Sequence, residues 1–479
     1  MDRMTPLDAA FLQIEDSEPT ASLAISSVAV FDGPPPTPED FRRHIAGRLP
    51  LIPRYRQKVR QIPLDIGPPV WIDDEHFDID YHLRRTALPD PGGDAELAAL
   101  LGRVMSARLD RDHPLWEYWL VEGLAGGRWA LISKVHHCMV DGVSGTDLYR
   151  VILDPTPTPP PVLVDEWHPA PEPSGLRLTA DAALELARNP IGQARAIADV
   201  VRHPTTLAGM VRDTLRGAAT LATAAWPAPA SSISGPLSAN RRFAFGRGTV
   251  VDVATIRKSF GGTFNDVVLS AITGGYRALL LGRHETPAPG LVRTLVPVSV
   301  RAPGEEGTRG NRVSLMLATL PIEVADPVER LAAVTSRLAA LKADHEAEAG
   351  AALIGIAGIE PFPLSAATVR TLSLVPQRAV VTVTTNVAGP REPLYAAGRQ
   401  LREIIPYVPI GSTMRIGVAI FSYCGAITFG VTGDYDSASD IGVLARGIEG
   451  GMAELAAAAK AAGQPASNGT ARKHRAGKA

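Results

Sequence analysis

Strand-like apolar runs alternate with helical patterns along this 479-residue chain, and they divide it into two units joined by a connector. In the first unit, the runs Leu23 to Phe31 and Trp129 to Val135 predict strands, and the stretch Asp94 to Leu109 predicts a helix. Residues 1–153 therefore form a mixed α/β unit.

A proline-rich and then amphipathic segment, residues 154–234, connects the two units. From Asp154 to Ser174 it contains too many prolines for a helix interior or a central strand, so we expect an extended chain. Across residues 176–226, Ala, Leu and Val recur at helical spacing between charged positions, which indicates amphipathic helices interrupted near Pro190 and Pro204. Their apolar faces can pack against the two units or contact a lipid surface.

The second unit, residues 235–463, has the same mixed character and no repeat of the first at the residue level. Its predicted strands are Leu291 to Val300, Val313 to Leu320, Ala379 to Thr385 and Met414 to Tyr423. The tail, residues 464–479, is polar, basic and rich in small residues, so we expect disorder there.

Composition narrows the classes of function and the compartment. The formal net charge of −2 offers no general attraction for polyanions, which argues against a nucleic-acid partner. Only Cys138 and Cys424 are present, which favours a reducing compartment, and the N-terminal region lacks the apolar core of a signal peptide. No run approaches the ~18 apolar residues of a membrane span. We expect a cytoplasmic protein whose contact with the inner membrane or lipid inclusions, if any, is peripheral.

The segment with the clearest chemical signal is HHCMVDG, where a strand-like run ends at His136-His137 and a helical pattern resumes after Gly142. Acyl transfer to an alcohol needs a base, because a free alcohol is a poor nucleophile at neutral pH, and imidazole is well suited. Asp141 is placed to brace the turn, and Gly142 allows a backbone angle that a Cβ would forbid. The pattern predicts acid–base chemistry at a strand–turn–helix corner.

Other interpretations of the same residues remain open. His136, His137 and Asp141 are also suitable as ordinary turn and capping residues. A zinc site at His137 and Asp141 would need further ligands, and no second His or Cys cluster stands nearby, so we expect no metal. Cys138 directly follows the histidines and is interpreted as a packing residue rather than a nucleophile.

The HHCMVDG motif resembles the signature of the superfamily of chloramphenicol acetyltransferase, carnitine acyltransferases and peptide-synthetase condensation domains, in which the second His is the general base. By this resemblance His137 is the proton acceptor. Nearly the whole chain resembles the bacterial wax ester synthase/diacylglycerol acyltransferase family, through the segments TPLDAAFL (5–12), HPLWEYWLVEGL (113–124), SGPLSANRRFA (234–244), FNDVVLSAITGGYRALL (264–280), VPVSVR (296–301), GNRVS (310–314) and TNVAGP (385–390).

The resemblance implies two chloramphenicol-acetyltransferase-like α/β domains with mixed sheets and a helical connector, and an active-site tunnel at their interface. It also implies direct acyl transfer, without an acyl-enzyme, from acyl-CoA to a lipid alcohol. Diacylglycerol is the expected acceptor and a long-chain fatty alcohol the second; acyl-CoA is a co-substrate and no cofactor is expected. The alternatives are a carrier-protein-dependent condensation enzyme and a non-catalytic lipid-droplet protein. Acceptor, chain length and oligomeric state stay open.

Further site residues follow from the family segments. Pro114-Leu115-Trp116 is interpreted as a packing corner that supports the substrate channel, with plain core packing as the alternative. Asn265-Asp266 opens the helical stretch Val267 to Leu281, so one of the pair can cap its first amides, and the resemblance marks both as needed for activity.

Two further sets of residues are assigned from charge and hydrogen-bonding capacity. Thr385 and Asn386 could donate hydrogen bonds to a developing oxyanion. The family usually has Ser-Asn-Val-Pro-Gly-Pro here; Thr keeps the hydroxyl, while Ala in place of the first Pro relaxes the loop. Arg301, Arg309 and Arg312 flank a Gly-rich segment and could meet the phosphates of CoA, or simply be solvated surface charges.

Overall fold

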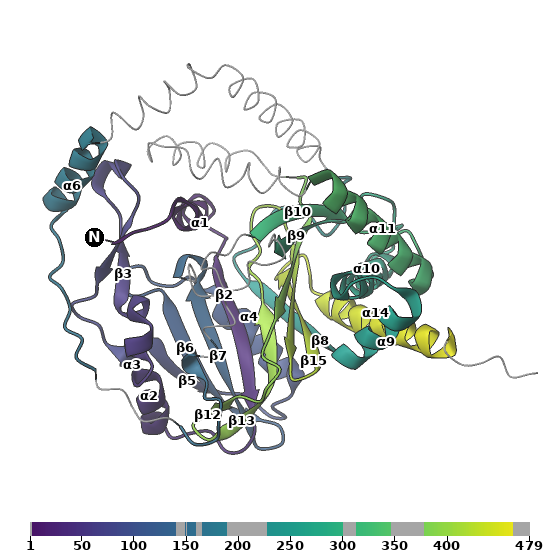
Figure 1. Ribbon diagram of the computed structural model, residues 1–479, viewed down its shortest axis with the longest axis horizontal. Coiled ribbons are helices and arrows are strands. Elements are labelled where there is room, and N and C mark those ends of the chain that lie inside the picture. The colour runs from purple at the N-terminus through teal and green to yellow at the C-terminus, as the bar shows by residue number, and fades with distance from the viewer. Residues whose placement is uncertain are drawn as a thin grey trace, which may run out of the picture.

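The computed structural model describes residues 2–139, 149, 151–159, 165–188, 228–299, 313–345 and 378–462. Its main body consists of two six-stranded sheets that lie side by side, with helices packed on them (Figure 1). Several predicted features lie outside the described residues, namely Asp141, Gly142, Arg301, Arg309, Arg312, residues 189–227 of the connector and the tail.

The first sheet has the strand order β12-β13-β2-β7-β6-β5. Its strands are β2 (Ala24–Phe31), β5 (Leu83–Ala87), β6 (Trp116–Leu124), β7 (Arg128–His136), β12 (Tyr395–Ala396) and β13 (Arg399–Tyr407). Only the β5–β6 pairing is parallel. Strand β7 lies between β2 and β6 and is buried along most of its length, which fixes where its last residue, His136, emerges.

The second sheet has the order β10-β9-β11-β14-β15-β8 and carries its helices on one side (Figure 1). Its strands are β8 (Arg241–Thr249), β9 (Arg293–Ser299), β10 (Val313–Thr319), β11 (Thr382–Ala388), β14 (Ile416–Tyr423) and β15 (Ala426–Asp434), and its helices are α9 (Val250–Phe260), α10 (Phe264–Gly282), α11 (Pro327–His345) and α14 (Ile441–Ala462). A Cβ at Gly447 of α14 would lie 2.8 Å from the Cα of Gly275, so these glycines let α10 and α14 approach closely.

The remaining elements complete the first unit and the connector. They are β1 (Asp2–Arg3), β3 (Gln57–Arg60) and β4 (Val70–Asp73), which form a small sheet; helices α1 (Pro6–Ser17), α2 (Pro38–Ala46), α3 (Ile79–His82), α4 (Asp94–Ser106) and α6 (Gly175–Arg188); and short 3₁₀ turns at Leu49–Leu51, Pro53–Arg56, Pro63–Asp65 and His137–Met139. No helix within the described ranges is long and apolar enough to span a bilayer.

The two units exchange elements, which the predicted boundaries did not anticipate. Strand β13 pairs antiparallel with β2, so residues 395–407, assigned from sequence to the second unit, complete the first sheet. In return α4 packs on β8, where a Cβ at Gly102 would lie 2.7 Å from the Arg241 carbonyl oxygen. The β13–β2 pairing and the α4–β8 contact therefore tie the two sheets together.

The predicted α/β class with two mixed sheets is confirmed, and most predicted strands match within two residues. The exception is β11, which begins at Thr382 and ends at Ala388, three residues later than predicted at each end. The described part of 154–174 contains no helix or named strand and makes one bridge, Asp154 to Tyr395, as its proline content predicts. Helix α6 confirms the first amphipathic helix of the connector.

Candidate active site

The histidine pair lies where β7 ends and a 3₁₀ turn, His137–Met139, begins. The backbone N–H of His136 donates to the carbonyl of Leu115, at 2.9 Å. The N–H of His137 donates to the carbonyl of Leu23, at 3.1 Å. Backbone bonds to both flanking segments therefore fix the place where the two rings leave the sheet.

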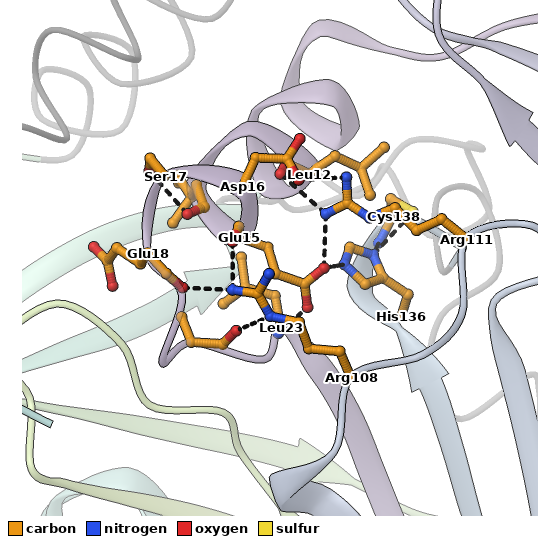
Figure 2. Close-up of polar contacts among 12 residues, drawn as sticks. Leu12, Glu15, Asp16, Ser17, Glu18, Leu23, Arg108, Arg111, His136 and Cys138 are labelled. Carbon is orange, nitrogen blue, oxygen red and sulfur yellow. Dashed lines mark hydrogen bonds and ion pairs between the residues drawn. The ribbon is translucent and has the colours of Figure 1, made fainter. Parts of the chain in front are cut away.

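The His136 ring is buried, with 1% of its surface exposed, and its surroundings define its tautomer (Figure 2). Its Nδ1 accepts the backbone N–H of Cys138 at 3.2 Å, and the Cys138 Sγ lies 3.0 Å from the same nitrogen. An Nδ1 that accepts a bond leaves the proton of a neutral ring on Nε2. That Nε2 lies 3.4 Å from Oε2 of Glu15.

Glu15 comes from α1, which begins after the N-cap Thr5 and carries Pro6 at its first position. Its Oε1 accepts the N–H of Leu23 at 3.0 Å, and its Oε2 accepts from Arg111 at 2.8 Å (Figure 2). Burial by itself raises the pKa of this carboxyl, but His136, Arg111 and the Leu23 amide together lower it to about 2. Glu15 is therefore an ionised, buried partner of His136 at neutral pH.

His137 differs from its neighbour in packing against an aromatic ring. Its ring centroid lies 4.0 Å from that of Phe11 on α1, with the planes 35° apart. Burial, reinforced by the adjacent His136, lowers the pKa of His137 to about 4. The imidazole is consequently neutral at pH 7 and free to accept a proton.

Cys138 is buried, and both its Sγ and its backbone N–H contact Nδ1 of the His136 ring. Burial raises the pKa of its thiol, so the thiolate that a nucleophilic cysteine requires is disfavoured. The prediction of a packing residue is confirmed. Across the described ranges no group of three or more His, Cys, Asp or Glu side chains is arranged to hold a metal ion.

Pro114-Leu115-Trp116 forms a buried corner beside the end of β7, where Trp116 of β6 pairs with Val135. The Trp116 ring stacks on Tyr55 and on His82, with ring centroids 4.7 Å and 4.2 Å away. Its Nε1 donates to the Tyr55 carbonyl at 2.8 Å. Since the Leu115 carbonyl accepts the His136 N–H, this packing corner also holds the end of β7. The alternative prediction of core packing is confirmed for Leu115 and Trp116, while support of a substrate channel stays a prediction.

The Asn265-Asp266 prediction needs correction at the cap. Helix α10 begins at Phe264 after the N-cap Thr263, because Thr263 and Asp266 form a reciprocal capping box: the Asp266 N–H donates to Thr263 Oγ1 and the Thr263 N–H to Asp266 Oδ2. Asp266 is thus a buried capping partner. Asn265 instead accepts a hydrogen bond from Asn386 Nδ2, which brings two predicted motifs together. Thr385, next to Asn386 on β11, is half-buried.

Comparisons with known proteins decide the family. The model of the wax ester synthase/diacylglycerol acyltransferase catalytic domain matches residues 4–268, and that of the WS/DGAT C-terminal domain matches residues 309–456. This chain belongs to the wax ester synthase/diacylglycerol acyltransferase family. It is an acyltransferase. A probable diacylglycerol O-acyltransferase of Mycobacterium tuberculosis is 40% identical over 96% of this chain and 97% of the relative.

Two solved structures share the fold of this chain. The wax ester synthase/diacylglycerol acyltransferase from Marinobacter aquaeolei VT8 superposes with a TM-score of 0.65 at 24% identity, over 96% of this chain and 100% of that one. The starter condensation domain of rhizomide synthetase, in complex with C8-CoA and Leu-SNAC, gives 0.57 at 13% identity, over 97% and 95%. The predicted two-domain α/β fold is confirmed.

Two charged residues of this acyltransferase were missed from sequence, Glu15 and Arg111. A signal for the first was present: Asp8, Leu12 and Glu15 are spaced four and three residues apart, so Glu15 falls on the buried stripe of α1. A carboxylate on such a stripe needs a buried partner. Arg111, five residues after the end of α4, carried no comparable signal.

Proposed function

We propose that this acyltransferase esterifies the free hydroxyl of diacylglycerol with a fatty acyl group from acyl-CoA, and that long-chain fatty alcohols are a second class of acceptor. Family membership supports acyl transfer, and the 40% identical relative named for diacylglycerol supports the acceptor. The single observation that carries the chemistry is the place of His137 in the turn that follows β7, with its backbone held by Leu23 and its ring against Phe11.

In the proposed mechanism His137 removes the proton of the acceptor hydroxyl as its oxygen attacks the thioester carbonyl. The resulting oxyanion collapses, the C–S bond breaks, and the CoA sulfur leaves with the proton that His137 returns. The acyl group passes directly to the acceptor, since the one cysteine beside the base, Cys138, is held as a buried thiol. The proposal uses acyl-CoA as co-substrate and invokes no cofactor.

The oxyanion needs a hydrogen-bond donor, for which we propose Asn386, with the neighbouring Thr385 as a second donor. Asn386 donates one Nδ2 hydrogen to Asn265, and the second Nδ2 hydrogen is the one we assign to the oxyanion. In this arrangement Asn265 supports the donor, which accounts for a functional role of the Asn265-Asp266 pair without contact between Asp266 and substrate. Arg301, Arg309 and Arg312 remain proposed partners of the CoA phosphates.

The test is ester formation from labelled palmitoyl-CoA with diacylglycerol and with hexadecanol, for the wild type and His137→Ala. We expect triacylglycerol as the main product and a fall of kcat by about 10³ in the variant, within the usual range for a positioned base. His168→Ala, which removes an exposed histidine, is the matched control and should retain full activity.

Each alternative outcome has a distinct meaning. Equal product from wild type and His137→Ala would refute the role of His137. Activity only with palmitoyl-acyl carrier protein would indicate a condensation-type enzyme, and no ester with either donor would indicate a non-catalytic lipid-associated protein. Because diacylglycerol partitions into lipid, we also propose peripheral contact with lipid surfaces, which co-flotation with diacylglycerol-containing vesicles would test.

A further inference from the structure

Arg111 binds two neighbouring carboxylates of α1 from outside the helix (Figure 2). One amino group lies 2.8 Å from Oε2 of Glu15 and 3.3 Å from the carbonyl oxygen of Leu12; the other lies 2.6 Å from Oδ1 of Asp16. The Glu15 side chain is 3% exposed and Arg111 28%, so the pair joins a buried acid to a partly accessible cation. A planar guanidinium presents its donors in a rigid fork that fits these contacts, whereas an ammonium is a point charge on a flexible stem.

The Glu15 carboxylate connects Arg111 to both histidines of the site. Its Oε2 faces Nε2 of His136. Through Oε1 it accepts the N–H of Leu23, and the carbonyl of the same Leu23 accepts the N–H of His137. Moving Glu15 would therefore disturb the ring of one histidine and the backbone of the next.

From this geometry we propose that Arg111 is a positioning residue for acyl transfer, acting through Glu15 on His136 and His137. The proposal rests on the proposed function of His137 as the base. Within the described part of the chain, Arg111 binds the carboxylates of α1 rather than either histidine. It holds the carboxylate that sets the His136 ring and the start of the His137 turn. A displacement of about 1 Å at a reacting group can cost 10² in rate, so small shifts at Glu15 should appear in kcat.

Steady-state kinetics of Arg111→Lys and Arg111→Met, with palmitoyl-CoA and diacylglycerol, test this directly. We expect kcat to fall about tenfold in the Lys variant and about 30-fold in the Met variant, with the KM for palmitoyl-CoA within about threefold of wild type. Arg85→Met breaks an exposed Arg–Glu pair with Glu122 at the edge of the same sheet and is the control, with kcat unchanged. A large rise in KM without loss of kcat would overturn the proposal, since it would mark Arg111 as a CoA-binding residue.

The double variant Glu15→Gln/Arg111→Met separates positioning from a general structural effect. If Arg111 acts through Glu15, the double variant should lose no more kcat than Glu15→Gln alone, because a neutral amide no longer needs the cation. Losses of kcat that multiply would overturn the proposal. Thermal melting of each variant shows whether the fold persists, and Arg111→Lys retains the charge should Arg111→Met fail to fold.

Histidine ¹⁵N chemical shifts provide a readout that does not depend on turnover. In the wild type His136, assigned with a His136→Gln spectrum, should be a single Nε2–H tautomer; in Arg111→Met it should become a mixture. An unchanged His136 signal together with unchanged kcat would overturn the inference while leaving the proposed function intact. If wild type forms no ester but His136 still responds to Arg111→Met, the proposed function fails and the Arg111–Glu15–His136 linkage stands.

Discussion

Two buried carboxylates of this acyltransferase, Glu15 and Asp154, each have an arginine and a histidine partner, yet their histidines are turned differently. At Glu15, the Nδ1 of His136 accepts a backbone N–H, so the protonated Nε2 faces the acid. At Asp154, the His44 Nε2 lies 2.8 Å from the carbonyl oxygen of Ile152, so the protonated Nε2 donates to the backbone. The Nδ1 of His44 then faces the Asp154 carboxylate at 3.9 Å.

The difference shows that composition alone does not define an acid–histidine pair. Asp154 depends on Arg48 for its charge partner, and its backbone exchanges two hydrogen bonds with Tyr395, both 2.8 Å. It therefore fastens the start of the connector to α2 and β12. Glu15, by contrast, orients the ring that precedes the proposed base. We expect the first cluster to govern stability and the second to govern turnover.

Asp154→Asn should show the largest effect, on stability. The substitution leaves Arg48, whose side chain is 14% exposed, without its charge partner, and breaking such a pair costs about 3 kcal/mol of unfolding free energy. Urea denaturation measures this loss, and kcat per folded molecule should stay at the wild-type value. The control Asp80→Asn removes an exposed pair with Arg42 and should cost under about 0.5 kcal/mol. Equal losses in both variants would contradict the comparison.

Glu15→Gln should differ by adding a loss of turnover. Removing the charge that faces His136 Nε2 frees the ring orientation, and we expect kcat to fall about 100-fold. The urea midpoint should fall as well, because a carboxyl with a lowered pKa stabilises the folded chain at neutral pH. Glu122→Gln, which breaks the Arg85 pair at the sheet edge, is the matched control. A Glu15→Gln enzyme of normal kcat but low stability would place Glu15 in the same structural class as Asp154.

The pH dependence of stability follows from the lowered pKa of His137. His137 has a pKa of about 4 in the folded chain against 6.5 for an ordinary histidine, so the unfolded chain binds more protons between these values. Stability should therefore be lost as the pH falls from 6.5 towards 4, and His137→Gln should flatten this dependence of the melting temperature. Burial also lowers the pKa of His44, so His44 adds to the loss of stability as the pH falls.

The same shift predicts the pH profile of catalysis. With the base neutral down to a pH of about 4, kcat/KM should be nearly constant between pH 5.5 and 8. A half-maximal point near pH 6.5 in initial rates would instead indicate a histidine of ordinary pKa.

Cys138→Ala should have the smallest effect. The backbone N–H of residue 138 still donates to His136 Nδ1, and the buried thiol is no nucleophile, so we expect kcat within about threefold of wild type. Iodoacetamide at pH 8 should modify the exposed Cys424 and spare Cys138, as read by mass spectrometry, without loss of activity. Loss of activity in Cys138→Ala comparable to that in His137→Ala would contradict direct transfer.

Local patterns made the strands, helix α4 and the histidine turn predictable. The sequence places His136-His137 at the end of an apolar run, and hydrophobic burial makes that run strand β7. Helix α10 begins before the predicted position because Thr263, rather than Asn265 or Asp266, is its N-cap. Thr263 forms a capping box with Asp266 that fixes this start. The exchange of β13 into the first sheet was not predictable, since antiparallel partners far apart in sequence leave no local periodicity.

The sequence by itself determined the chemistry available: a histidine pair at a strand end, a proline-rich connector and the motifs of an acyltransferase family. Only the tertiary structure decided which groups meet. It brought Glu15 of α1 and Arg111 of the loop after α4 to His136, and Asn386 of β11 to Asn265 of α10. The physical reason is that ion pairs and side-chain hydrogen bonds act over a few ångströms of space, while sequence patterns report only burial and backbone geometry within one element.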